Sequence, residues 1–305
     1  MYHNDDIYVT KEELEKSILQ SKRMVSEFDQ IGKNSDYFKE LSNLALLQIE
    51  AGYLEESEIN LLECLKFFEQ EQDNLGQASV YGILGTLFFK KGEYQKSIEN
   101  YNQALVTYKR LNQVAEEIMC LKGLAANFIK LHNLENACEK YIECSTICSE
   151  NNDIYNLLDC LGNLIYIYET KKEWDMVFEL YKKSLEAFKT LGDNKGIITS
   201  YFNLGIIQKS DKNYEESIRY FKLGTNTAID ANYTELILKG LSYVGEILVY
   251  QGKLSEAKQE YIKALYLAKK INATNSILQL NVLLKSLGLS DSQIESEFNN
   301  YTENL

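Results

Sequence analysis

The feature that most constrains the fold of this chain is a pattern that recurs every forty residues. We call positions forty residues apart one slot of the repeat. The slot of Gly52 lies between two apolar segments, and the slots after it hold large and small side chains in alternation, three and four residues apart. Such spacing is typical of the packed stripe of a helix. A second helix precedes each turn, marked by pairs such as Leu84-Gly85 and Leu204-Gly205. Six copies of one helix pair predict an all-α, right-handed α-solenoid of stacked antiparallel helix pairs.

The same pattern sets the expected domain boundaries. We expect one continuous array, in which a tight turn inside each repeat alternates with a longer connection between repeats. Terminal repeats need a polar outer face, so a cap is expected at the C-terminal end. The predicted segments are a disordered start at 1–10, an N-terminal half-repeat helix at 11–30, six full repeats plus a final first helix at 31–287, a capping helix at 288–299 and a frayed end at 300–305.

Composition excludes several classes of function. The 305 residues carry a net charge of -13, which opposes binding to a phosphate backbone and argues against a nucleic-acid partner. No apolar run approaches the length of a membrane span, and the polar start does not resemble a signal peptide. A soluble protein of the cytoplasm, with no membrane insertion, is therefore expected.

The cysteines follow the repeat. Most of the six fall at slots that require a small residue, so we interpret them as buried packing thiols in a reducing compartment. Cys144 and Cys148 are neighbours on one helical face, but no CxxC pair or histidine set accompanies them, and no metal is predicted. His3 and His132 offer no acid-base pair, and no glycine-rich phosphate loop or nucleophile motif occurs. We expect no cofactor and no enzymatic activity.

Several slots together resemble a known family. Gly92, Tyr94, Ser97 and Tyr101, followed by Ala104-Leu105, are similar to the tetratricopeptide repeat consensus. The resemblance covers about residues 11–287, although the usual repeat has thirty-four residues and often ends in proline, which this chain lacks. The longer repeat is similar to spindle-orientation scaffolds, kinesin light chains and bacterial peptide-pheromone receptors. That resemblance implies a groove that holds a peptide.

In such a stack the first helix of each repeat lines the concave face. Asparagine stands just before the buried leucine in three repeats, and a carboxamide both donates to and accepts from a peptide backbone. Neighbouring aromatic and aliphatic residues would supply an apolar patch, or else they pack between adjacent helices. The predicted partner-binding residues are Asn43, Asn163, Tyr166, Phe202, Asn203, Ile206 and Tyr243, with repeats 4 to 6 as the first choice of site.

Three lysines on the first helices of repeats 2 and 3 form a separate candidate. Lys90, Lys122 and Lys130 could contact an acidic ligand in an otherwise acidic chain. The tetratricopeptide clamps that bind chaperone tails combine such lysines with asparagine, whereas Thr86 and Ala126 stand at the corresponding slots of this chain. Ordinary solvated lysines are the alternative interpretation.

These patterns predict a non-catalytic adaptor or scaffold that binds a peptide or helical segment of another protein in its concave groove. Two alternatives stay open. One is a stand-alone peptide sensor of the pheromone-receptor type, without the N-terminal module that those receptors carry. The other is a scaffold that assembles with further copies of itself.

Overall fold

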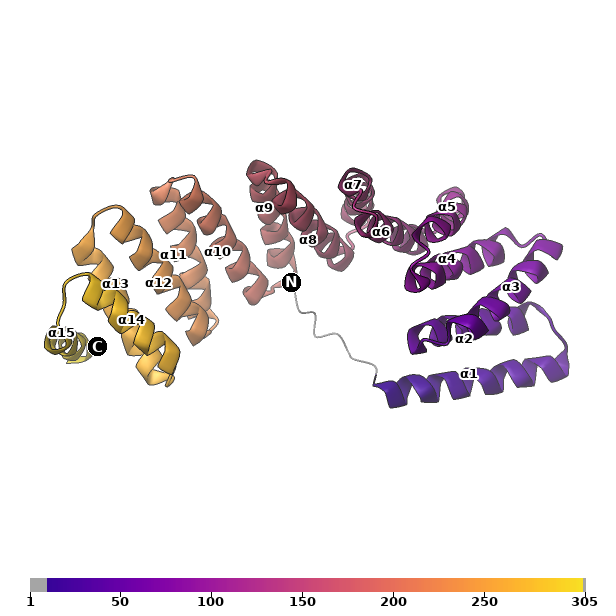
Figure 1. Ribbon diagram of the computed structural model, residues 1–305, viewed down its shortest axis with the longest axis horizontal. Coiled ribbons are helices and arrows are strands. Elements are labelled where there is room, and N and C mark those ends of the chain that lie inside the picture. The colour runs from indigo at the N-terminus through magenta and orange to yellow at the C-terminus, as the bar shows by residue number, and fades with distance from the viewer. Residues whose placement is uncertain (1–9, 304–305) are drawn as a thin grey trace. The chain divides into compact units, whose positions relative to one another are not determined.

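The structure is a computed structural model that describes residues 10–303, and it consists of helices joined by short turns (Figure 1). No strand occurs within that range, so the prediction of an all-α array of helix pairs is confirmed. The chain divides into two compact units, an N-terminal half that ends at Ile167 and a C-terminal half that begins at Tyr168.

Helices α2 to α13 follow one another along the chain two to a repeat, and we number these repeats 1 to 6. The helices are α1 (Lys11–Ile31), α2 (Ser35–Ala51), α3 (Leu54–Gln70), α4 (Asn74–Lys91), α5 (Tyr94–Arg110), α6 (Val114–Lys130), α7 (Leu134–Glu150), α8 (Ile154–Lys171), α9 (Trp174–Leu191), α10 (Asn194–Ser210), α11 (Tyr214–Asp230), α12 (Thr234–Tyr250), α13 (Leu254–Lys270), α14 (Thr274–Ser286) and α15 (Asp291–Glu303).

The two kinds of connection have the same backbone geometry, which corrects the expected alternation of short and longer turns. Every twentieth residue from Gly52 to Asn272 has φ between 53° and 86°. The amide of the next residue then donates to the carbonyl five positions before it, as from Tyr53 to Gln48 at 2.8 Å and from Lys253 to Leu248 at 2.9 Å. This left-handed residue closes the helix and satisfies its last carbonyls. The backbone therefore repeats every twenty residues.

Lys212 is one of the non-glycine residues in this left-handed conformation, with φ 61°. Because a side chain is strained there while glycine is not, Lys212→Gly is expected to raise the free energy of unfolding by about 0.5–1 kcal/mol. Urea unfolding followed by helical circular dichroism measures the change. Lys222→Gly, at an exposed site inside α11, is the matched control and is expected to lose about 1 kcal/mol. Equal effects of the two variants would contradict this account.

In the N-terminal half, the core forms along the contact between successive helices. Ser57 and Ser97 are fully buried, and each hydroxyl donates to a carbonyl of the preceding helix, at 2.9 Å to Ala45 and at 2.7 Å to Gly85. Gly85 has no room for a side chain, because a Cβ there would lie 2.8 Å from the ring of Tyr101. Small residues on one helix thus admit the aromatic ring of the next.

Both ends of the described chain carry a covering helix. The N-terminal helix α1 begins at a capping box, in which Thr10 and Glu13 form reciprocal hydrogen bonds. Further along α1, the hydroxyl of Ser21 donates to the carboxylate of Glu40 in α2 at 2.5 Å. The predicted disordered start, 1–10, lies outside the described residues except for Thr10, which caps α1. At the other end, α15 begins later than the expected cap and continues into the segment expected to fray, since Phe298 and Tyr301 pack against Tyr266 of α13.

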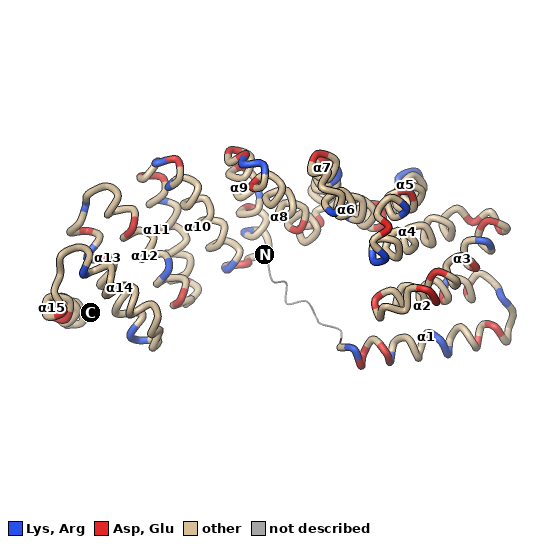
Figure 2. The backbone as a smooth tube through the Cα atoms, viewed as in Figure 1, with Lys and Arg blue, Asp and Glu red and all other residues tan. Residues whose placement is uncertain are grey.

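Charges of both signs are spread over the described helices (Figure 2). Several ion pairs join neighbouring repeats, including Lys91 with Glu58 and Lys109 with Glu143, both at 2.5 Å. Within residues 10–303, no helix is both long enough and apolar enough to cross a membrane.

Candidate functional site

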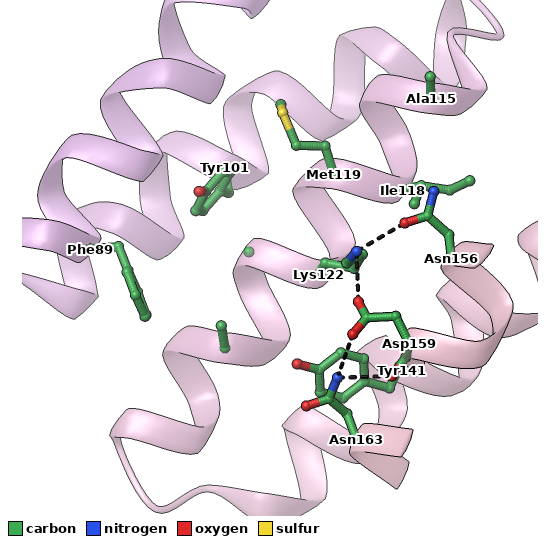
Figure 3. Close-up of a pocket in the computed structure, with 12 residues that line it drawn as sticks. Phe89, Tyr101, Ala115, Ile118, Met119, Lys122, Tyr141, Asn156, Asp159 and Asn163 are labelled. Atoms are coloured by element: carbon green, nitrogen blue, oxygen red, sulfur yellow. Dashed lines mark hydrogen bonds and ion pairs between the residues drawn. The ribbon is translucent and has the colours of Figure 1, made fainter. Parts of the chain in front are cut away.

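A cavity of about 590 Å³ opens in the N-terminal half, where the first helices of repeats 2, 3 and 4 face it (Figure 3). Helix α6 supplies half of the lining, α8 supplies three polar residues, and α5 and α7 each contribute a tyrosine. The lining residues are Phe89, Tyr101, Ala115, Ile118, Met119, Lys122, Gly123, Ala126, Tyr141, Asn156, Asp159 and Asn163.

The polar part of the cavity is a network centred on Lys122. Its ammonium donates to the side-chain oxygen of Asn156 at 2.9 Å and pairs with Asp159 at 2.6 Å. Asn163 donates to the backbone carbonyl of Asp159 at 2.9 Å, so its side chain is held against α8. Figure 3 shows these side chains pointing toward one another from α6 and α8. The two helices are therefore joined across the cavity by charge and hydrogen bonding.

The network fixes the charge of Lys122. Burial of the ammonium lowers its pKa, but the hydrogen bond to Asp159 and the charge of that carboxylate outweigh burial, and the pKa of Lys122 is raised above its usual value. The lysine is consequently a permanent cation at neutral pH. It can hold a ligand oxygen, but it is not poised to act as a base.

Apolar and aromatic side chains complete the cavity. Met119 is 43% exposed, while Ile118 beside it is buried. The hydroxyl of Tyr101 shares a hydrogen bond of 3.0 Å with Thr86, and burial raises the pKa of this phenol. Burial, followed by the charge of Asp159, likewise raises the pKa of Tyr141 above its usual range. Both tyrosines are therefore neutral hydrogen-bonding groups at the base of an apolar surface.

The structure brings together two candidates that the sequence assigned to different sites. Asn163 was expected in a peptide groove and Lys122 in an acidic-ligand clamp, yet both line one cavity and share Asp159 as a partner. Lys90 and Lys130 are exposed and do not belong to this lining, so the three lysines do not converge on it.

The remaining candidates of the N-terminal half lie elsewhere on the surface. Asn43 is exposed on α2 and donates to Glu40 at 3.4 Å, which leaves it outside the cavity lining. Tyr166 is 56% exposed on α8 and is likewise not a lining residue.

In the C-terminal half, Phe202 is not available to a partner, which corrects its assignment as a binding residue. Its side chain is only 3% exposed, and its ring lies 6.1 Å from that of Phe221 and 5.6 Å from that of Tyr243. Tyr243 is half-buried and stacks on Phe221 at 4.6 Å. These three rings pack the core between α10, α11 and α12.

Asn203 is half-buried and Ile206 is 39% exposed, so both reach the surface of α10. A cavity of about 540 Å³ does occur in this half, but it lies at the turn between α10 and α11, and neither residue lines it. Apart from Phe202, the first choice of site in repeats 4 to 6 stays a prediction.

Sequence reasoning missed Asn156 and Asp159, although a signal for them exists. Asp159 lies four residues before Asn163 on one helical face, and it follows Lys122 by thirty-seven residues. Lys209 and Glu246 have the same separation and also form an ion pair, at 2.6 Å. Two residues thirty-seven positions apart, three fewer than the length of a repeat, therefore contact each other from successive first helices.

Comparison with known proteins finds one repeat family in two segments of the chain. The family model described as tetratricopeptide repeat matches residues 78–105 and 198–226. Among curated proteins, none matches the sequence.

Solved structures share the fold. BtubC (BKLC) from P. vanneervenii is 20% identical with a TM-score of 0.56, over 72% of this chain and 92% of that one. The apo form of RapI is 14% identical with a TM-score of 0.51, over 82% and 97%. A signal-transduction ATPase with numerous domains from Pyrococcus horikoshii, which has a tetratricopeptide repeat sensor, is 13% identical with a TM-score of 0.54; the likeness covers 96% of this chain but 46% of the ATPase. The chain is therefore a helical repeat protein, in which residues 78–105 and 198–226 match the tetratricopeptide repeat.

Proposed function

We propose that this chain is a non-catalytic interaction protein that binds a peptide or helical segment of a protein partner in the cavity of repeats 2 to 4. The observation that carries the proposal is the polar network of Lys122, Asn156, Asp159 and Asn163, which stands beside an exposed apolar surface in one cavity. A few placed polar groups in a largely apolar concave site are typical of ligand recognition.

Asn163 is the residue best placed to form a hydrogen bond with a peptide backbone. Its amide nitrogen is bonded to Asp159, whereas its side-chain oxygen has no hydrogen-bond partner among the described residues. That oxygen can accept from a peptide N–H without breaking any bond inside the protein. Because Asp159 already holds the amide, the carboxamide is oriented before the ligand arrives, which lowers the entropy lost on binding.

The apolar side of the cavity favours a segment that also carries an aromatic or aliphatic side chain. Met119 and Phe89 lie on α6 and α4, beside the buried rings of Tyr101 and Tyr141. Methionine adapts to differently shaped apolar groups because its side chain is unbranched and flexible. We therefore propose a ligand segment that places an apolar side chain here and its backbone amides over Asn163.

Binding fits this cavity better than catalysis does. The lining contains no histidine, serine or cysteine, and Asp159 keeps Lys122 protonated. The six free cysteines are all buried, in keeping with a reducing compartment, so location in the cytoplasm stays part of the proposal.

Substitution of Asn163 tests the site. Peptides are first selected from a displayed random library against the full chain, and the binding of the tightest is then measured by calorimetry. Asn163→Ala is expected to weaken binding about tenfold, because one hydrogen bond to the peptide is lost.

Asn203→Ala is the matched control, because Asn203 occupies the same repeat slot in α10 but lies outside the cavity. It is expected to bind the peptides as the wild type does. The site would not lie in this cavity if the selected peptides bound Asn163→Ala as tightly as the wild type. The same would follow if they lost affinity only for Asn203→Ala.

A further inference from the structure

Three cysteine thiols come together inside repeats 3 and 4. Cys144 and Cys148 belong to α7 and Cys160 to α8, and all three side chains are 0% exposed. The sulfur atoms all lie within 4.8 Å of one another, and those of Cys144 and Cys148 are 4.0 Å apart. The sequence indicated only the pair on α7, because Cys160 follows on the next helix.

Packing accounts for small residues at these three positions, but not for cysteine at all three. Cys144 stands at the slot of Ala104 and Ala264, and Cys160 at that of Ser200 and Gly240, so small residues are usual at both. The slot of Cys148 holds Phe68, Tyr108, Phe188, Ala228 and Ala268 in other repeats, and the rings of Phe68 and Phe188 lie against Gly76 and Gly196, where this repeat has Asn156. A small residue therefore suits position 148, and the one present is a cysteine, whose sulfur lies against the other two.

The spacing of the sulfurs suits one ion bound in their midst. Three sulfurs at about 2.3 Å from a central ion, the usual metal–sulfur distance in thiolate sites, lie about 4.0 Å from one another in a trigonal plane. The pair on α7 already has that spacing, and Cys160 needs to move by less than an ångström to reach it.

The donor set selects the kind of ion. Within residues 10–303 this group consists of three thiols, with no histidine or carboxylate in it. Structural zinc takes four ligands, whereas soft sulfur ligands select Cu(I). We propose that Cys144, Cys148 and Cys160 form a buried trigonal thiolate site for a soft monovalent cation, Cu(I).

Binding of Cu(I) releases the protons of the three thiols. Burial raises the pKa of the Cys148 thiol to about 12, and a hydrogen bond with Cys160, together with burial, raises the pKa of Cys144 above its usual range. Formation of three Cu–S bonds breaks three S–H bonds and releases three protons to solvent, and the oxidation state of copper does not change. The complex carries two negative charges. The ammonium of Lys122, which acts electrostatically on Cys144 and Cys160, offsets part of that charge.

The repeats themselves supply variants that should fold. Alanine occurs naturally at the slots of Cys144 and Cys148, and serine at the slot of Cys160, so Cys144→Ala, Cys148→Ala and Cys160→Ser copy residues that other repeats already hold. The matched control is the double variant Cys64→Ala and Cys120→Ser, which makes the same changes at the same slots in other repeats. Circular dichroism verifies the helical content of each variant before metal is added.

The test is a titration of the reduced full chain with Cu(I) under anaerobic conditions, in competition with the chromophoric chelator bicinchoninate. The wild type and the control are expected to take up one equivalent of Cu(I), with three sulfurs in the X-ray absorption spectrum and an affinity that rises with pH. Each variant of the three cysteines is expected to bind about a hundredfold more weakly. The proposal would be overturned if the wild type took up less than one equivalent of Cu(I), or if the spectrum showed two sulfurs. It would also be overturned if Cys148→Ala bound Cu(I) as tightly as the wild type.

Discussion

Replacement of Phe202 by alanine is expected to lower the free energy of unfolding by about 3–5 kcal/mol, the cost of removing a fully buried aromatic side chain. The ring is 3% exposed and lies against Phe221 and Tyr243. It also fills the space above Gly224, where a Cβ would lie 2.6 Å from its edge. Because neighbouring helices enclose the site, it cannot collapse easily around the missing ring. Urea unfolding of the full chain, followed by circular dichroism, measures the loss.

Ile206→Ala is the control for this prediction. Ile206 lies one turn further along α10, and its side chain is 39% exposed. Its truncation is expected to change the free energy of unfolding by no more than about 0.5 kcal/mol, as is usual at the surface. If the two variants had similar stabilities, Phe202 would not be a core residue, and its assignment to a binding surface would have to be restored.

Replacement of Gly196 by asparagine is expected to cost about 3 kcal/mol, the upper range for overpacking a core. A Cβ at Gly196 would lie 2.2 Å from the ring of Phe188, which is 5% exposed and cannot turn into solvent. Asn156 holds the same slot one repeat earlier, and there Cys148 replaces the ring.

The backbone is not the obstacle at this slot. The amides of Asn156 and Gly196 each donate at 3.1 Å to the aspartate three residues before them, Asp153 and Asp193. At the facing slot of the preceding helix, one repeat has Cys148 and the other has Phe188.

A double-mutant cycle isolates this contact. Phe188→Cys alone is expected to destabilise the chain, because it leaves a cavity. The combination of Phe188→Cys with Gly196→Asn reproduces the natural pair of repeats 3 and 4, and we expect it to be about 1–3 kcal/mol more stable than the sum of the two single changes. Additive effects in urea unfolding would show that the two positions are not in contact.

The positions of the helices were predictable because each depends on local signals. The forty-residue period locates the turn inside each repeat, including those where His132, Lys172 and Lys212 replace glycine in the left-handed conformation. The twenty-residue repetition of the backbone escaped detection, since the connections that begin at Gln72 and Asn112 contain no glycine. Any residue that tolerates a positive φ closes a helix in the same way, so the residue types conceal the common geometry.

The candidate site was predictable only in part. Asn163 and Lys122 were selected because they lie on first helices, where a groove is expected. Their meeting through Asp159 depends on the distance between α6 and α8, which no single repeat encodes. The assignment of Phe202 to a binding surface was wrong for a related reason, because the direction of a side chain at the edge of a helix depends on the space that its neighbours leave.

The sequence by itself determined the helices, their turns and the pairing of one helix with the next, because these follow from periodicity and backbone conformation. The tertiary structure alone decided which slots face the core and which face a cavity. Lys122 and Phe202 occupy equivalent slots of repeats 3 and 5. Phe202 turns inward because Gly224 and Gly240 leave room for its ring, whereas Cys144 and Cys160 fill the corresponding slots near Lys122. Lysine must also keep its charge paired, so it turns to Asp159 and the cavity, and the same slot faces the core in one repeat and a cavity in another.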